Sequence, residues 1–167
     1  SIEESIDLFQ QTIALDPMFG PAYLRLAYAY LLLPEYDLSI STESMYELAA
    51  ATTKAGIKAD PSIEKLAGAV VGFIYHKQGK WLQSAESYEM ALSAETVDPI
   101  SHHWYSRLLA SVGRLDESLN QARLAYEADP DSAVLISHLA MAYFWINDME
   151  QAGRYFGVVS KMTLEVP

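Results

Sequence analysis

Residues 106–122 read SRLLASVGRLDESLNQA, and the same order of small and large side chains occurs twice more, in GFIYHKQGKWLQSAESY at 72–88 and AMAYFWINDMEQAGRYF at 140–156. The three segments follow one another at intervals of 34 residues. A small residue opposite a large one at fixed offsets lets two helices approach closely, and a repeat of this length is typical of stacked helix–turn–helix units. The repeat therefore predicts an all-α fold. The residue at the turn of each unit is Gly79, Gly113 or Asn147.

These turn residues also help to place the helices. Gly79 and Gly113 stand where a helix end needs a left-handed residue, and Asn147 is the next best type for that conformation. Ser44 and Glu47 predict a capping box at the start of the third helix, after a polar insertion from Glu35 to Thr42. We predict helices at 2–15, 20–33, 43–58, 62–77, 81–94, 99–111, 115–128, 132–146 and 149–161.

The three segments resemble the tetratricopeptide repeat (TPR), and the resemblance extends less cleanly upstream through Tyr23 and Tyr30. It implies a right-handed α-solenoid of stacked antiparallel helix pairs, with about four and a half units and nine helices. Four Asp-Pro pairs mark the unit ends, because proline cannot continue the preceding helix but suits the start of the next. We expect a single domain cut from a longer protein, divided into 1–18 (a second helix only), 19–61 (with the insertion), 62–98, 99–130 and 131–167.

The composition excludes several classes of function. The net charge of −11 and the pI near 4.6 argue against a nucleic-acid partner, because phosphate binding needs clustered Lys and Arg. An acidic surface also disfavours anionic lipid, and the longest apolar run, Ala22 to Leu33, is too short to insert into a membrane. The chain has no cysteine and therefore no disulfide or thiolate metal site. We expect a folded domain without direct membrane insertion, in a compartment that the composition leaves open.

Catalytic and metal-binding patterns are sparse. Adjacent residues point about 100° apart on a helix, so His102 and His103 are poorly placed to share one metal ion. His76 and His138 have no partners at ligand spacing, and all four are expected to be ordinary surface or groove histidines. No phosphate-binding glycine loop or nucleophile elbow is present. We therefore predict no enzyme activity, no cofactor and no metal.

The resemblance to TPR domains places the first helix of each unit along a concave groove. The side chains expected to line this groove are aromatic and aliphatic, with a few cationic ones, and such a surface suits a protein or peptide segment. Packing between neighbouring helices is the alternative role for Tyr28, Phe73 and Phe144, whereas Trp145 is expected to be exposed. The predicted partner-binding residues are Tyr28, Phe73, His76, Lys77, His103, Arg107, Met141, Phe144 and Trp145.

Two functions are consistent with the sequence. The first is a non-catalytic module that binds a protein or peptide in its groove or self-associates through exposed end helices. The second follows from a resemblance, carried by His102-His103-Trp104-Tyr105 and the segment 113–118, to repeat regions of bacterial CadC-like transcriptional regulators and repeat-bearing adenylate cyclases. That resemblance implies a sensory domain of a membrane-anchored regulator, in the bacterial cytoplasm or periplasm. A closed pocket or a bound metabolite would distinguish the second function from the first.

Overall fold

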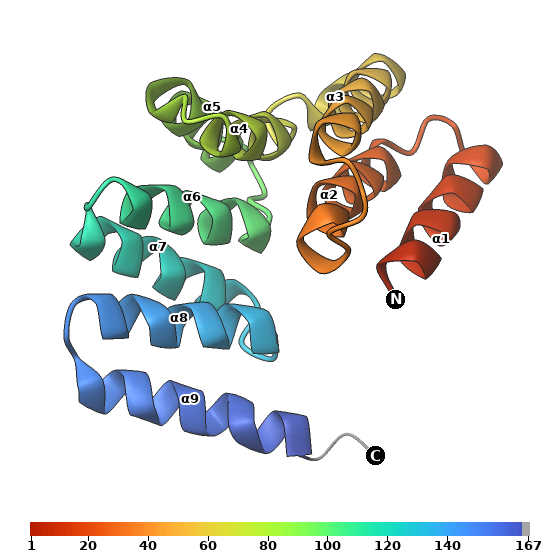
Figure 1. Cartoon of the computed structure of the whole chain (residues 1–167). Coiled ribbons are helices and arrows are strands. Elements are labelled where there is room, and N and C mark those ends of the chain that lie inside the picture. The colour runs from red at the N-terminus through yellow and green to blue at the C-terminus, as the bar shows by residue number, and fades with distance from the viewer. Residues whose placement is uncertain (165–167) are drawn as a thin grey trace. The chain divides into compact units, whose positions relative to one another are not determined.

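The structure, a computed structural model, describes residues 1–164 and contains nine α-helices and no β-strand within them (Figure 1). The prediction of an all-α fold built from helix pairs is confirmed. Most predicted helices agree with the observed ones to within a few residues. The helices are α1 (Ile2–Leu15), α2 (Gly20–Tyr36), α3 (Thr42–Ala59), α4 (Gly68–Lys77), α5 (Trp81–Leu92), α6 (Pro99–Ser111), α7 (Leu115–Ala128), α8 (Ala133–Trp145) and α9 (Met149–Leu164), with a 3₁₀ helix, η1 (Pro61–Ile63).

The chain divides into two compact units, residues 1–95 and residues 96–167. In unit 1, α2 packs on α1 and α3, and α4 packs on α5. In unit 2, α6 packs on α7, α7 on α8 and α8 on α9. The boundary falls at Glu95 and Thr96, inside the segment that separates two repeats by a few extra residues. The predicted division into repeats as parts of one domain stays a prediction.

The three turns of the repeat have the same backbone conformation. Gly79, Gly113 and Asn147 have positive φ values of 71°, 80° and 65°. After Gly113, the Arg114 N–H donates to the Leu109 carbonyl at 2.9 Å, and equivalent bonds of 2.9 and 3.0 Å close the other two turns. This is the hydrogen bond of a Schellman motif, which ends a helix with one left-handed residue. The turn prediction is confirmed at all three positions.

The small residues of the repeat also carry hydrogen bonds between the paired helices. The Ser84 hydroxyl donates to the Gly72 carbonyl at 2.7 Å, and the Ser118 hydroxyl donates to the Ser106 carbonyl at 2.8 Å. All four residues are buried, and Ala152 takes the same place in the third repeat. A small side chain at this place therefore admits the close approach, and a serine adds a bond across it.

The start of α3 differs from the prediction. Ser41 caps this helix by accepting a hydrogen bond from the Ser44 N–H at 3.3 Å, so the predicted capping box of Ser44 and Glu47 is wrong. The helix begins at Thr42, and α2 continues through Pro34 to Tyr36. Proline in the last turn removes only one intrahelical bond, so it does not end α2. The loop is therefore shorter than the predicted insertion.

The helix predicted at 62–77 begins only at Gly68. Two packing contacts explain the shortening. Ile63 is buried beside Gly20 and Gly56, whereas Gly68 lies so close to α5 that a Cβ there would be 2.3 Å from the Ser87 carbonyl oxygen. The chain satisfies both contacts by bending between them as η1 and a series of turns. As a result α4 has 10 residues, whereas α6 and α8 have 13 each.

Candidate partner-binding surface

The predicted groove residues of unit 1 mostly contact other residues of the same unit. Tyr28 is 6% exposed and Phe73 is 2% exposed. Lys77 lies over the Phe73 ring, 5.2 Å from its centroid, and its ammonium group forms an ion pair of 2.5 Å with Glu35 of α2. The His76 ring meets the Trp81 ring edge-on with 5.7 Å between centroids. The packing role that was the alternative for the aromatic rings therefore holds for Tyr28 and Phe73.

The predicted residues of unit 2 divide between core and surface. His103 is 7% exposed, whereas Phe144 is 48% exposed. Trp145 is partly buried and meets the His138 ring edge-on at 5.8 Å between centroids, so the expectation that it is exposed is wrong. Arg107 and Met141 are partly buried. Phe144 is therefore the aromatic ring of this set that offers most surface to a partner.

A buried polar cluster joins α6, α7 and α8 in unit 2. The Ser106 hydroxyl donates to the Ser118 carbonyl at 2.7 Å, and the Ser118 hydroxyl donates to the Ser106 carbonyl. The Nε2 of His138 lies 2.8 Å from the Ser106 Oγ, which has already given its proton to a carbonyl. Nε2 is therefore the protonated nitrogen and donates to that oxygen. The arrangement holds Ser106 as a buried acceptor and does not activate it as a nucleophile.

The two histidines of this cluster stay neutral at ordinary pH. The rings of His103 and His138 meet edge-on with 4.5 Å between centroids. Burial lowers the pKa of His103 to about 3, with further lowering from His138 and Arg107, and burial and Arg107 lower the pKa of His138 to about 4. The expectation that these two were ordinary surface or groove histidines is wrong. Sequence spacing gave no signal for the contact, since it joins different repeats.

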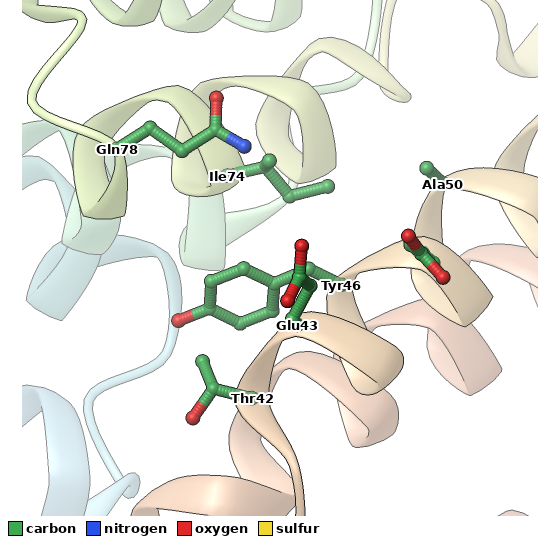
Figure 2. Close-up of a pocket in the computed structure, with 7 residues that line it drawn as sticks. Thr42, Glu43, Tyr46, Ala50, Ile74 and Gln78 are labelled. Atoms are coloured by element: carbon green, nitrogen blue, oxygen red, sulfur yellow. The ribbon is translucent and has the colours of Figure 1, made fainter.

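A second feature, which the groove prediction missed, is a cleft between α3 and α4 in unit 1. Figure 2 shows its first part, where Tyr46 and Glu43 project from α3 toward Ile74 and Gln78 of α4. This part has a volume of about 500 Å³ and is also lined by Thr42, Glu47 and Ala50. The Tyr46 ring meets the buried Phe73 ring edge-on with 6.1 Å between centroids, which fixes the floor of the pocket.

The cleft continues along the second half of α3. Its second part has a volume of about 710 Å³ and is lined by Val71 of α4 and by seven residues of α3, which are Ala50, Ala51, Thr53, Lys54, Ala55, Ile57 and Lys58. Ala50 lines both parts and therefore joins them. We call the two parts together the α3–α4 cleft. Glu43, Glu47, Ala50, Lys54 and Lys58 follow one another at intervals of three and four and share one face of α3, and the other lining residues flank this stripe on both sides.

The corresponding seam in unit 2 is closed. There α7 buries Leu119 and Ala122 against Leu139 and Tyr143 of α8 in a common cluster. In unit 1, Ala50 and Ala51 of α3 stay exposed, because α4 is short and meets α3 at few positions. The sequence did carry a signal for this difference: a helix between two others needs apolar residues on two faces, whereas one face of α3 carries glutamates, alanines and lysines.

Comparisons with known proteins support the fold. The chain is similar to TTC0263, a thermophilic TPR protein of Thermus thermophilus, with 23% identity and a TM-score of 0.62 over 86% of this chain and 73% of that one. It is similar to YrrB, a TPR protein with an unusual peptide-binding site, with 18% identity and a TM-score of 0.58 over 98% and 79%. Cut9, in its complex with Hcn1, gives 16% identity and a TM-score of 0.68 over 96% of this chain and 31% of its own.

At these identities the likeness is one of fold, and the fold is that of TPR proteins. No protein-family model and no curated protein matches the sequence. Within residues 1–164, no three potential metal ligands among His, Asp and Glu lie together. None of the helices in that range combines the length and the hydropathy that crossing a bilayer requires.

Proposed function

We propose that this chain is a non-catalytic interaction module that binds a segment of another protein, and that the α3–α4 cleft is its principal binding site. The observation that carries the proposal is the open seam itself. Stacked helical repeats bury the faces between neighbouring hairpins, and unit 2 does so, whereas α3 leaves one face uncovered. A cleft lined by an aromatic ring and by charged side chains suits a peptide or a helix.

The groove predicted from the sequence becomes a secondary surface in this proposal. Tyr28, Phe73 and His103 support the helices, while Phe144 remains available for contact. In the buried cluster, Ser106 is 0% exposed and its hydroxyl donates to a carbonyl rather than to the histidine, so this cluster is not a nucleophilic site. YrrB, a protein with the same fold, has a peptide-binding site, which agrees with this proposal.

The test is a selection of binders from a library of random peptides, each about four helical turns long, displayed on phage. Selected peptides are then measured by fluorescence anisotropy against the wild-type protein and against Ala50→Trp, which places a large ring where the two parts of the cleft join. Ala50 is exposed, so the variant is expected to fold, and circular dichroism checks this. Phe144→Ala is the comparison variant, because it removes the exposed ring of the secondary surface.

We expect the selected peptides to bind in the micromolar range and to lose at least tenfold in affinity with Ala50→Trp but not with Phe144→Ala. A selection that yields no binder at all contradicts the proposed function. If the peptides lose affinity with Phe144→Ala and not with Ala50→Trp, the principal binding site is the secondary surface and not the cleft.

Self-association through the end helices stays a prediction. No residue of α1 is buried, and Leu8 and Leu15 are 61% and 88% exposed. Sedimentation velocity over a hundredfold range of concentration should show a rising mass in the wild type that is reduced in Leu8→Ser/Leu15→Ser. A constant monomer mass in both proteins would show that this surface does not pair.

The sensory role in a bacterial regulator also stays a prediction. It depends on the sequence resemblance to CadC-like regulators and repeat-bearing cyclases, which the structural comparisons do not bear on. The α3–α4 cleft is an open groove rather than a closed pocket, and this favours a macromolecular partner over a metabolite.

A further inference from the structure

We infer that the α3–α4 cleft binds an amphipathic helix of a partner protein, with acidic residues in its first turn and basic residues in its last, running antiparallel to α3. The inference rests on the proposed function and adds the kind of partner, its charge pattern and its direction. It follows from the distribution of charge along the cleft and from the shape of the α3 face.

The cleft has an acidic end and a basic end. Glu43 and Glu47 line the part formed by the first half of α3, and Lys54 and Lys58 line the part formed by the second half. All four are exposed, and none forms an ion pair with any residue from 1 to 164. Their charges are therefore available to a partner, and the cleft has opposite electrostatic preferences at its two ends.

Stabilisation of α3 itself explains only two of these four charges. A helix is stabilised by acidic residues in its first turn and basic residues in its last, and Glu43 and Lys58 occupy those turns. That effect falls off within one turn, so it does not account for Glu47 and Lys54, which lie farther in. The two inner charges instead extend each end of the cleft toward its centre, where Ala50 and Ala51 lie.

The dimensions of the cleft suit a helix. From Glu43 to Lys58 the axis of α3 rises about 22 Å at roughly 1.5 Å per residue, the length of a helix of about four turns. Ala50 on one side of the charged stripe, and Ala51 and Ala55 on its other side, have small side chains, and small residues let a second helix approach closely. Opposite them, Val71 and Ile74 of α4 provide an apolar wall. An apolar stripe on the partner helix would fill this space.

The direction of the partner follows from its own electrostatics. A stable amphipathic helix carries acidic residues near its start and basic residues near its end. Its basic end complements Glu43 and Glu47, and its acidic start complements Lys54 and Lys58. The partner helix then runs antiparallel to α3, and the positive end of each helix dipole lies beside the negative end of the other. A helix in the other direction would place like charges together at both ends of the cleft.

Two hydrocarbon-stapled peptides of about four helical turns test this inference. Both carry the same Leu and Ala stripe and the same composition; one has Glu in the first turn and Lys in the last, and the other has these charges exchanged. The staple keeps both helical, which circular dichroism confirms, and their net charge is identical. We expect fluorescence anisotropy to show at least tenfold tighter binding of the first peptide to the wild-type protein at low salt, with a smaller ratio at high salt.

A charge-reversed protein, Glu43→Lys/Glu47→Lys/Lys54→Glu/Lys58→Glu, provides the decisive comparison. Its net charge is that of the wild type, and it should prefer the second peptide. The control Asp7→Lys/Glu86→Lys changes exposed charges on α1 and α5 and should keep the wild-type order. Equal affinities for the two peptides, or an order unchanged by the four reversals, would overturn the inference.

Failure here is distinguishable from failure of the proposed function. If phage selection yields cleft-dependent binders that are extended or lack the charge pattern, the interaction module stands and the helical partner is wrong. If neither stapled peptide binds and selection yields nothing, both fail.

Discussion

Unit 2 is expected to lose stability steeply as the pH falls from 7 to 5, because of the buried pair His103 and His138. Both imidazoles are held neutral in the folded protein, with pKa values lowered to about 3 and about 4. An unfolded histidine has a pKa near 6.5 and gains a proton over this range. The unfolded state therefore binds more protons than the folded state, so stability is lost as the pH falls below about 6.5.

The magnitude follows from this difference in proton binding. Between pH 7 and pH 5 an unfolded histidine goes from about one quarter protonated to almost fully protonated, whereas the folded pair stays neutral. This lowers the free energy of unfolding by about 2 kcal/mol for each histidine, and by at most about 4 kcal/mol for the pair. A unit of this size has a total stability of several kcal/mol, so unit 2 should be close to unfolding at pH 5.

Urea unfolding followed by tryptophan fluorescence measures the effect. In a Trp81→Phe background the remaining tryptophans are Trp104, buried in α6, and Trp145, in edge contact with His138. The signal then comes from unit 2 alone. The comparison variant is His103→Phe/His138→Gln, which removes both titrating groups while keeping similar volume. The measured quantity is the change in the free energy of unfolding between pH 7 and pH 5 within each protein.

We expect the wild type to lose about 3 to 4 kcal/mol more than the double variant over this range. Because each protein is its own reference, a lower starting stability of the variant does not matter. His102→Gln is the control, since His102 is partly buried and hydrogen-bonds to Gln121. Equal pH dependence in wild type and double variant would refute the reasoning, and with it the burial of two neutral imidazoles.

The remaining predictions concern the repeat itself. Gly113→Val should lower stability by about 1 to 2 kcal/mol through backbone strain at positive φ. A Cβ there meets nothing within 4 Å, so a steric clash adds nothing to this cost, and an unchanged thermal melt would contradict the prediction. Asn147→Gly should raise stability by up to about 1 kcal/mol by relieving the same strain, and a lower melting temperature would be the opposite result. Gly153→Ala and Gly157→Ala lie inside α9 with open space around them, so each should stabilise by about 0.5 to 1 kcal/mol in urea unfolding. Ser118→Ala should lower the free energy of unfolding in urea by about 1 to 3 kcal/mol, because the Ser106 carbonyl loses its hydrogen bond from the Ser118 hydroxyl. An unchanged free energy of unfolding would show that this hydrogen bond does not stabilise the fold.

Much of the fold could be predicted because the information is local. A left-handed residue at Gly79, Gly113 and Asn147 and a small residue at Ser84, Ser118 and Ala152 are each required by the backbone near them. The errors came from contacts between segments distant in sequence. The delayed start of α4 depends on Ile63 packing against α2 and α3 and on Gly68 packing against α5, and neither contact has a signature within 62–77.

The candidate site was harder to predict for the same reason. Periodicity shows which residues of a helix share a face, but it does not show whether that face is covered. Phe73 and His103 lie on helix faces that neighbouring helices cover, whereas Ala50 lies on a face that α4 leaves open. The groove prediction assumed that the helices stack regularly. The bend at η1 makes the packing of α4 on α3 irregular, and the cleft lies there.

The sequence by itself determined the helical class, the length of the repeat, the three turns and the acidic surface, because each depends on residue type and spacing along one segment. Only the tertiary structure decided which histidines are buried, which aromatic rings support the core and where a partner has room. Burial and open space depend on how closely two separate helices approach, and here a few contacts, at Ile63, Gly68 and Ser106, set that distance.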